Sequence, residues 1–301
     1  MITAGIDIGT NTVRMIVADV IDGKISSIIH QNRSVTRLGE GFIKSGLLRE
    51  DAIKRTFDSV VKFYYEALSY NPLKVKCCAT SAVREAENGH IFTELLRDHG
   101  IQIEIIDGET EGRLTALGVM SGLNFRNEPS LIVDIGGGST ELIYWSGRDL
   151  DFAKSFKIGV VKLSDMFDFS KPSTEDLLDR VNLYIADFFS DFNFSIEIKN
   201  IIATAGTPTT LAAIDMQMEN YDYRRVNGYI ITKKRLNELI SFISSKNIEE
   251  RKMIKGLEPG REDLIVPGSL ILMFLLDRFS KDQLIVSDFG LREGIAIAAA
   301  L

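Results

Sequence analysis

Two segments of the chain, Gly5–Ile16 and Ile132–Ile143, each place residues suited to phosphate binding between two apolar runs. The first apolar run carries Asp7 and the second carries Asp134, and a turn of glycines and hydroxyl side chains follows each aspartate. Glycine lets backbone N–H groups converge on an anion, the hydroxyls add donors, and the aspartate can hold a cation that shields the phosphate. The pattern therefore predicts two strand–turn–strand hairpins that each hold a phosphate group.

The turn residues are the candidate phosphate ligands. For the first hairpin taken alone, an ordinary turn in which Asp7 accepts backbone hydrogen bonds is the simpler explanation. In the second hairpin, three consecutive glycines cost backbone entropy and are rarely accepted unless another group approaches the backbone closely, which favours phosphate. An arginine just past the first turn can also bind a phosphate bidentately. The candidates are Gly9, Thr10, Asn11, Thr12 and Arg14 in the first hairpin, and Gly136, Gly137, Gly138 and Ser139 in the second.

A second pair of segments repeats in the same order as the hairpins. Cys77–Ala82 and Ile201–Gly206 are both apolar strands that end in Ala-Thr and run into a helix-forming segment. Asp134 follows Asp7 by 127 positions, and the second Ala-Thr pair follows the first by 124. This internal repeat predicts two homologous domains that face each other across a cleft. The alternative is coincidence in a chain with 24 glycines, which would have to produce both the order and the spacing.

The composition limits the class of protein. A chain of 301 residues with 45% hydrophobic residues has enough apolar material for two cores. The net charge of −7, with no long block of like charge, argues against nonspecific nucleic-acid binding. Cys77 and Cys78 are adjacent in an apolar strand and have no distant partner, as in reduced cytoplasmic proteins. Together with the lack of a leader or membrane span in the sequence, this predicts a cytoplasmic protein without a membrane partner.

Helix and strand signals alternate along the chain, which predicts an α/β protein with helices packed on mixed sheets. The polar segment Leu123–Pro129 is the predicted boundary between a first domain, residues 1–122, and a second domain, residues 123–290. We expect the C-terminal helix, residues 291–301, to pack back on the first domain. Further strands are predicted at 24–31, 75–79, 101–105, 130–135, 141–145, 151–158, 200–205 and 283–287, and helices at 50–70, 90–98, 108–120, 233–244 and 262–279.

Glu109 and Glu111 lie at the start of the predicted helix that leads toward the domain boundary, and hence toward the cleft. An acidic residue in a first helical turn commonly stabilises the helix dipole, and this explains Glu109. For Glu111, the same explanation and a role as a general base are equally open on the residues alone.

Five motifs together resemble the exopolyphosphatase and guanosine pentaphosphate phosphohydrolase family. They are Asp7–Arg14, Ala79–Arg84, Glu111–Leu114, Asp134–Glu141 and Gly290–Gly294. The family belongs to the actin, sugar-kinase and Hsp70 superfamily. The resemblance therefore implies two duplicated ribonuclease-H-like domains, of the actin-like ATPase type, with a cleft between them. The chain corresponds to a short two-domain form, because none of His30, His90 and His99 is followed by Asp as in the extra domain of longer members.

The resemblance also implies an activity and roles for individual residues. Family members use Mg²⁺ and release the terminal phosphate of inorganic polyphosphate or guanosine pentaphosphate, and a dimer is the common expectation. Glu111 would activate the attacking water, Asp134 and Glu141 would hold water or metal, and Arg84 would bind phosphate oxygens. The candidate metal ligands are Asp7, Asp134 and Glu141. Gly112, which follows the expected base, departs from the family pattern and is expected to loosen that part of the helix.

Two other functions remain open at this point. An ATP-dependent small-molecule kinase of the same superfamily would also use twin phosphate hairpins, and a nucleotide-gated, actin-like assembly protein would use the cleft to control polymerisation. For a hydrolase, three basic clusters bear on the substrate: Arg224-Arg225, Lys233–Arg235 and Arg251-Lys252. They are short and far apart in the sequence, so we expect each to be a solvated face. This favours short polyphosphates or guanosine pentaphosphate over very long chains.

Overall fold

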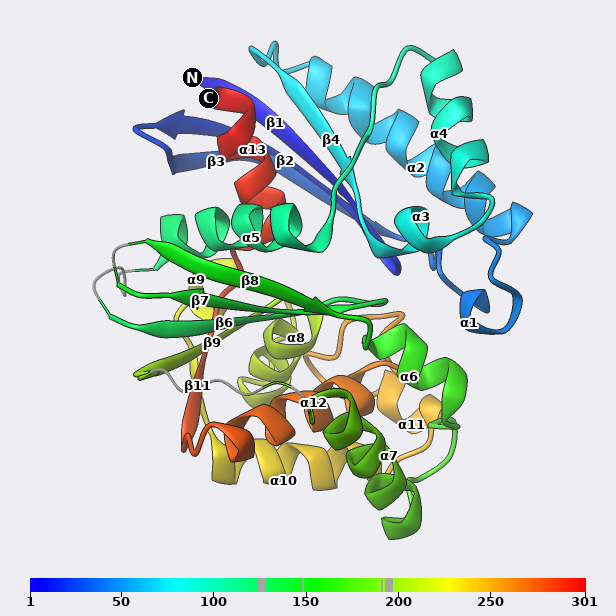
Figure 1. Cartoon of the computed structure of the whole chain (residues 1–301), viewed down its shortest axis with the longest axis vertical. Coiled ribbons are helices and arrows are strands. Elements are labelled where there is room, and N and C mark those ends of the chain that lie inside the picture. The colour runs from blue at the N-terminus through cyan, green and yellow to red at the C-terminus, as the bar shows by residue number, and fades with distance from the viewer. Residues whose placement is uncertain (124–127, 148, 191, 193–196) are drawn as a thin grey trace.

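The protein consists of two lobes, each built around one β-sheet (Figure 1). The structure is a computed structural model, and it describes residues 1–123, 128–147, 149–190, 192 and 197–301. Helices cover the sheets, which confirms the predicted α/β class. The predicted domain boundary at Leu123–Pro129 falls partly outside the described residues, so the domain limits stay a prediction.

The first sheet has the strand order β3-β2-β1-β4-β5. Strand β1 pairs antiparallel with β2 and parallel with β4. Helices α2 and α4 pack on one face of this sheet, and α13 packs on the other. The elements are β1 (Ile2–Ile8), β2 (Thr12–Ile21), β3 (Lys24–Val35), α1 (Phe42–Ser45), α2 (Glu50–Leu68), β4 (Val75–Ala79), α3 (Ser81–Glu85), α4 (Gly89–Asp98), β5 (Glu104–Ile105) and α13 (Leu291–Ala300).

The second sheet has the strand order β10-β11-β9-β6-β7-β8. Its outer face carries the largest apolar core of the described residues, formed with α6, α7, α8, α10 and α12. The elements are β6 (Ser130–Ile135), β7 (Thr140–Trp145), β8 (Leu150–Phe156), α6 (Val160–Met166), α7 (Glu175–Phe188), β9 (Asn200–Thr204), α8 (Gly206–Asp215), α9 (Tyr223–Val226), β10 (Ile230–Thr232), α10 (Lys233–Ser244), α11 (Ile248–Lys252), α12 (Ile265–Arg278) and β11 (Gln283–Val286).

The two sheets are copies of one design. Read from β8, the second sheet runs β8-β7-β6-β9-β11, which matches β3-β2-β1-β4-β5 strand for strand, and β10 is added at the edge. In both sheets the first strand in sequence pairs antiparallel with the second and parallel with the fourth. The turns match as well, because the Gly9 N–H donates to Thr12 O at 3.1 Å and the Gly136 N–H donates to Ser139 O at 2.9 Å. The predicted duplication is therefore confirmed.

Helix α5 (Gly108–Gly122) lies between the sheets (Figure 1). One of its faces packs on the inner face of the second sheet through Val119, and the other contacts α13 through Leu114. Strand residues alternate between the two faces of a sheet. Ile6 and Ile8 face the outer core of the first lobe and Val133 and Ile135 that of the second. The aspartates between those residues therefore point inward, toward the helical layer that joins the lobes.

The C-terminal helix α13 ends beside the N-terminus (Figure 1), and the Thr3 hydroxyl donates to Ala296 O at 2.7 Å. Helices α5 and α13 approach so closely that a Cβ on Gly294 would overlap the carbonyl oxygen of Leu114. Gly294→Ala is therefore expected to lower the free energy of unfolding by about 1–3 kcal/mol, the usual cost of overpacking. Urea titration measures this, with Ala300→Ser at the end of the same helix as the control. Equal midpoints for the two variants would contradict this packing.

Some local predictions are wrong for physical reasons. The alternating isoleucines at 101–105 predict a full strand, but only Glu104–Ile105 pair with β4. Arg251, predicted on a solvated face, is fully buried and donates to the carbonyl oxygens of Phe169 and Glu262 at 2.6 and 3.0 Å. Those carbonyl groups need a donor inside the lobe, and a guanidinium supplies several.

None of the helices in the described part of the chain is both long and apolar enough to span a bilayer.

Candidate active site

The two glycine turns face each other across a cavity between the lobes. The cavity takes in about 740 Å³, part of it open to solvent. It is lined by both turns with their aspartates, the first turn of α5, the segment after β9 and the start of α13. The turns approach closely, since a Cβ on Gly137 would lie 2.9 Å from the Cβ of Thr10. The absence of side chains at Gly137 and Gly138 thus keeps the backbone of the second turn open toward the first.

In the first hairpin, Asp7 on β1 lies opposite Arg14 on β2. Burial, partly offset by Arg14, raises the pKa of Asp7 to about 7. Its Oδ1 atom is buried and has no hydrogen-bond partner among the described residues. The turn itself is held from behind, because the Arg37 N–H donates to Asn11 O at 2.9 Å and the Gly39 N–H donates to Thr10 O at 2.8 Å. The loop after β3 therefore fixes the turn in place.

In the second hairpin, Asp134 and Glu141 occupy the same cross-strand positions, 127 residues after Asp7 and Arg14. The Thr115 hydroxyl on α5 donates to Asp134 Oδ2 at 3.1 Å. Burial raises the pKa of Asp134. The duplicated frame thus carries an arginine in one lobe and a glutamate at the equivalent place in the other.

Glu141 lies behind the cavity wall and is not among the residues that line it. Its side chain is fully buried, its Oε1 accepts a hydrogen bond from Ser155 at 2.6 Å, and its Oε2 has no partner among the described residues. Burial, with the neighbouring Asp134 charge, raises its pKa to about 8. Glu141 is therefore placed behind the cavity wall and is not itself exposed to the cavity.

Glu111 lies in the first turn of α5, which begins where the Asp107 side chain accepts the Thr110 N–H at 2.8 Å. It lines the cavity and is buried. Burial, followed by the charges of Glu141 and Asp134, raises the pKa of Glu111 well above its ordinary value. A carboxylate with a raised pKa next to a polar cavity is suited to accept a proton near neutral pH.

The structure explains why position 112 is a glycine, which the sequence alone does not reveal. A Cβ at this position would lie 2.5 Å from the Cβ of Ala153 on β8. Glycine therefore lets the start of α5 press against the second sheet and brings Glu111 next to Glu141. The expectation that Gly112 loosens the helix is not supported, because the residue is buried within a regular helix.

Arg84 lies beside Glu111 and not in the cavity wall. Its Nη1 atom donates to Ile106 O at 2.6 Å and to Glu111 Oε2 at 3.2 Å. The Arg84 side chain is 23% exposed, against 8% for Glu111. In this arrangement Arg84 holds the carboxylate, and further guanidinium N–H groups remain for another anion.

Several cavity residues are absent from the sequence-based prediction. They are Thr80, Ser81, Thr204, Ala205, Gly206, Arg261, Arg292 and Glu293. The repeated Ala-Thr pairs and the Gly290–Gly294 motif carry a signal for most of them. Arg261 has none, because it lies in an irregular loop and reaches the cavity only through the fold.

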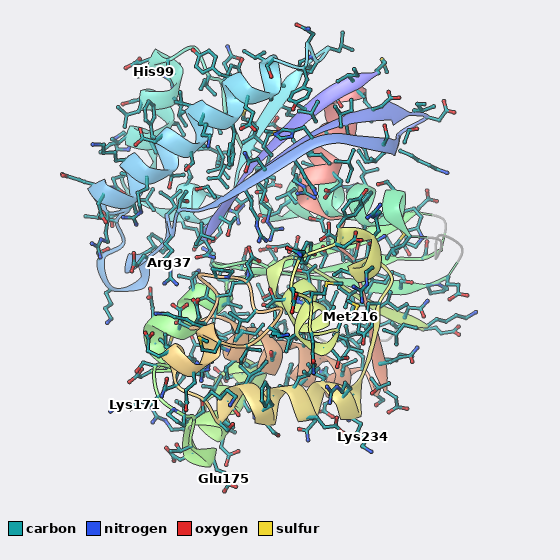
Figure 2. The ribbon with its side chains drawn as sticks, turned by 180° about the vertical axis from the view of Figure 1, so that it is seen from behind. Arg37, His99, Lys171, Glu175, Met216 and Lys234 are labelled. Atoms are coloured by element: carbon teal, nitrogen blue, oxygen red, sulfur yellow. The ribbon has the colours of Figure 1, made fainter. Side chains whose placement is uncertain are left out.

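Ion pairs connect the lobes beside the cavity. Figure 2 shows Arg37 at the boundary between the two lobes, and its guanidinium binds both carboxylate oxygens of Asp263 at 2.9 and 3.0 Å. Lys162 on α6 donates to Glu85 Oε2 at 3.2 Å. The other oxygen of Glu85 accepts a hydrogen bond from Ser81, which lines the cavity. Both lobes are thus held around the same space.

The residues present are compatible with a divalent cation. Asp7 and Asp134 line one cavity, and Asp7 Oδ1 lacks a partner. Within the described ranges, no cluster of three or more histidine, cysteine or acidic side chains forms a closed metal cage. Mg²⁺ commonly uses only one or two carboxylates and takes its other ligands from water and substrate phosphates. The donor set therefore fits Mg²⁺ bound together with a phosphate.

Comparison with known proteins agrees with this geometry. A statistical model of the Ppx/GppA phosphatase family matches residues 16–301. The chain is 33% identical, over 95% of its length, to the bifunctional 3-dehydroquinate synthase/phosphatase of Fusobacterium nucleatum, and spans 44% of that protein. It is 28% identical to exopolyphosphatase 2 of Mycobacterium tuberculosis, covering 99% of this chain and 98% of the relative. A crystal structure of the Aquifex aeolicus member of the Ppx/GppA family superposes with a TM-score of 0.84 at 34% identity, covering 100% of this chain and 97% of that one.

Proposed function

The chain belongs to the Ppx/GppA phosphatase family, and from this premise we propose that it releases the terminal phosphate of inorganic polyphosphate by hydrolysis. Guanosine pentaphosphate, which ends in the same kind of phosphoanhydride, is a second substrate to test. The relatives named exopolyphosphatase support a phosphoanhydride hydrolase. The observation that carries the proposal is the pair of duplicated glycine turns that face each other across one polar cavity.

The cavity can position a terminal phosphoryl group. Backbone N–H groups of both turns and the hydroxyls of Thr10, Thr12 and Ser139 would bind its oxygens, and Arg14 adds a positive charge. Phosphoryl transfer depends mainly on such positioning and on neutralising the charge of the phosphate oxygens. A Mg²⁺ ion held by Asp7 and Asp134 would add to this neutralisation.

Glu111 is the proposed general base. Its carboxylate would take a proton from a water molecule as the water oxygen bonds to the terminal phosphorus. The bond from that phosphorus to the bridging oxygen breaks, and the bridging oxygen leaves with the shortened chain. Burial, together with the charges of Glu141 and Asp134, raises the pKa of Glu111 and so favours proton transfer to it. Glu141 is thus proposed as a positioning residue behind the base, and a direct hold on water or metal is the alternative.

Replacing Arg84 distinguishes two roles of this residue, phosphate binding and holding Glu111. If it binds phosphate oxygens in the ground state and the transition state alike, Arg84→Ala is expected to raise KM about 10-fold with a smaller change in kcat. Steady-state kinetics on polyphosphate measures both values. Arg113→Ala is the matched control, because that arginine lies on the exposed side of α5 with Glu109. A collapse of kcat at constant KM would instead assign Arg84 to holding Glu111.

One experiment tests the proposed function as a whole. Phosphate release is measured side by side on short polyphosphate, long polyphosphate, guanosine pentaphosphate and ATP, with and without Mg²⁺. We expect release from polyphosphate that requires Mg²⁺. Formation of ADP and a sugar phosphate from ATP and a sugar panel, without hydrolysis of polyphosphate, would favour the kinase alternative.

A further inference from the structure

A second pocket lies beside the active-site cavity. It takes in about 800 Å³, part of it open to solvent. Arg14 and Arg292 line both spaces, so the two adjoin. Beyond them, the second pocket is lined by Arg33 from the first lobe and Tyr221 and Asp288 from the second. Two arginines therefore lie at the boundary between the cavity and this pocket.

Arg14 lies where the two spaces meet. Its guanidinium makes no hydrogen bond or ion pair with any residue that the structure describes, whereas Arg292 is bound to Glu293. A guanidinium offers five N–H donors, and a half-buried one without partners can bind an incoming anion without first breaking an ion pair. The free Arg14 group therefore indicates an anionic ligand at the junction of the spaces.

Arg33 lies farther from the cavity and is only partly used. One nitrogen, Nη1, contacts Glu258 Oε1 at 2.5 Å, and the side chain is 47% exposed. Its guanidinium carbon lies 6.0 Å from the centre of the Tyr221 ring. Arg33 lines the pocket, and its guanidinium makes no other hydrogen bond or ion pair with the described residues, so it offers a second anion contact beyond Arg14.

The acidic residues of the pocket hold the arginines in place. The Tyr221 hydroxyl donates to Asp288, and Asp288 Oδ2 lies 3.8 Å from Arg292 Nη2. Glu258 lies between Arg33 and Arg261 and contacts both. Each carboxylate thus orients a guanidinium but uses only part of its donors. Three arginines against two carboxylates leave the pocket with an excess of positive charge.

We propose that the second pocket binds the phosphates that follow the scissile one, with Arg14 and Arg292 at the leaving phosphate and Arg33 at the next. The ligand is a phosphoanhydride chain, whether it is inorganic or attached to a nucleoside. This inference rests on the proposed function to the extent that the terminal phosphoryl group occupies the cavity. It makes Arg33 a specificity residue that reads the length of the chain.

The test measures binding and so does not depend on turnover. Isothermal titration calorimetry with Mg²⁺ present uses three probes: inorganic phosphate, a methylene-bridged tripolyphosphate that cannot be hydrolysed, and the methylene-bridged analogue of guanosine triphosphate. Arg33→Gln is expected to weaken both triphosphates about 10- to 100-fold, as for loss of a charged hydrogen bond, and to weaken inorganic phosphate much less.

Arg37→Gln is the matched control. It also removes an arginine that pairs across the lobes, but Arg37 lines neither space. Equal weakening of triphosphate binding by the two variants would mean that Arg33 acts only by joining the lobes. The proposal would also be overturned if Arg33→Gln did not weaken binding, or weakened binding of the nucleotide analogue alone. If the wild-type chain binds tripolyphosphate through Arg33 but releases no phosphate from any polyphosphate, the proposed function fails and the pocket stands. If, in addition, tripolyphosphate does not bind, both the proposed function and the proposed role of the pocket fail.

Discussion

Replacing Glu111 with glutamine is expected to lower kcat about 10²- to 10⁴-fold while KM changes little, which is the usual effect of removing a general base. Glutamine keeps the size of the side chain and can still contact Arg84, but it cannot accept the proton of the attacking water. The two glutamates that flank the start of α5 differ sharply, since Glu111 is buried in the cavity and Glu109 is 63% exposed.

Glu109→Gln is therefore the matched control, because it removes one negative charge from the same helical turn. Steady-state phosphate release from polyphosphate gives kcat and KM for both variants. Near-normal turnover of the Glu111 variant would remove this residue from the mechanism. An equal loss in both variants would indicate that the charge of the helix start matters, and not a base in the cavity.

Removing Mg²⁺ with a chelator is expected to lower phosphate release about 10³-fold, because a metal ion at a transferring phosphoryl group contributes several kcal/mol. The structural reason is the pair of aspartates that line the cavity, one of which has an unpartnered buried oxygen. Adding Mg²⁺ back should restore the rate.

Asp7→Asn connects this effect to the site. The variant is expected to need a higher Mg²⁺ concentration for half-maximal activity, because it loses one negatively charged ligand. A titration of activity against Mg²⁺ measures this shift, with Asp107→Asn, which caps α5 away from the cavity, as the control. Full activity in the presence of excess chelator would contradict a role for the metal.

The duplicated frame could be predicted from the sequence because local patterns determine it. Successive side chains of a strand point to opposite faces, and this places Asp7 and Asp134 on the inner faces, opposite to their isoleucine and valine neighbours. The spacing of 127 positions then predicts equivalent turns, which the two sheets confirm. Adjacent Cys77 and Cys78 likewise lie in different apolar clusters, on opposite faces of β4.

Not all arginines of the site could be predicted in the same way. Arg14 follows the first turn and is predicted from it, and Arg292 lies in the Gly290–Gly294 motif. Arg33 and Arg261 are isolated in the sequence, and only the packing of the two lobes brings them to the site. The clustered basic residues, which attract notice in the sequence, lie elsewhere, and Arg251 among them serves the core. The need for glycine at position 112 could not be predicted either, because it arises from contact with Ala153 on a strand far along the chain. Contacts between distant segments carry this information, and no local pattern does.

The most direct test of the account follows the oxygen atom of the attacking water. The wild-type chain is incubated with long polyphosphate and Mg²⁺ in ¹⁸O-labelled water, and the products are analysed by mass spectrometry. The account predicts that monophosphate is released with a single labelled oxygen, while the shortened chain carries no label. Release of longer fragments, label at the new end of the chain, or no hydrolysis at all would contradict the binding of a terminal phosphoryl group between the two turns.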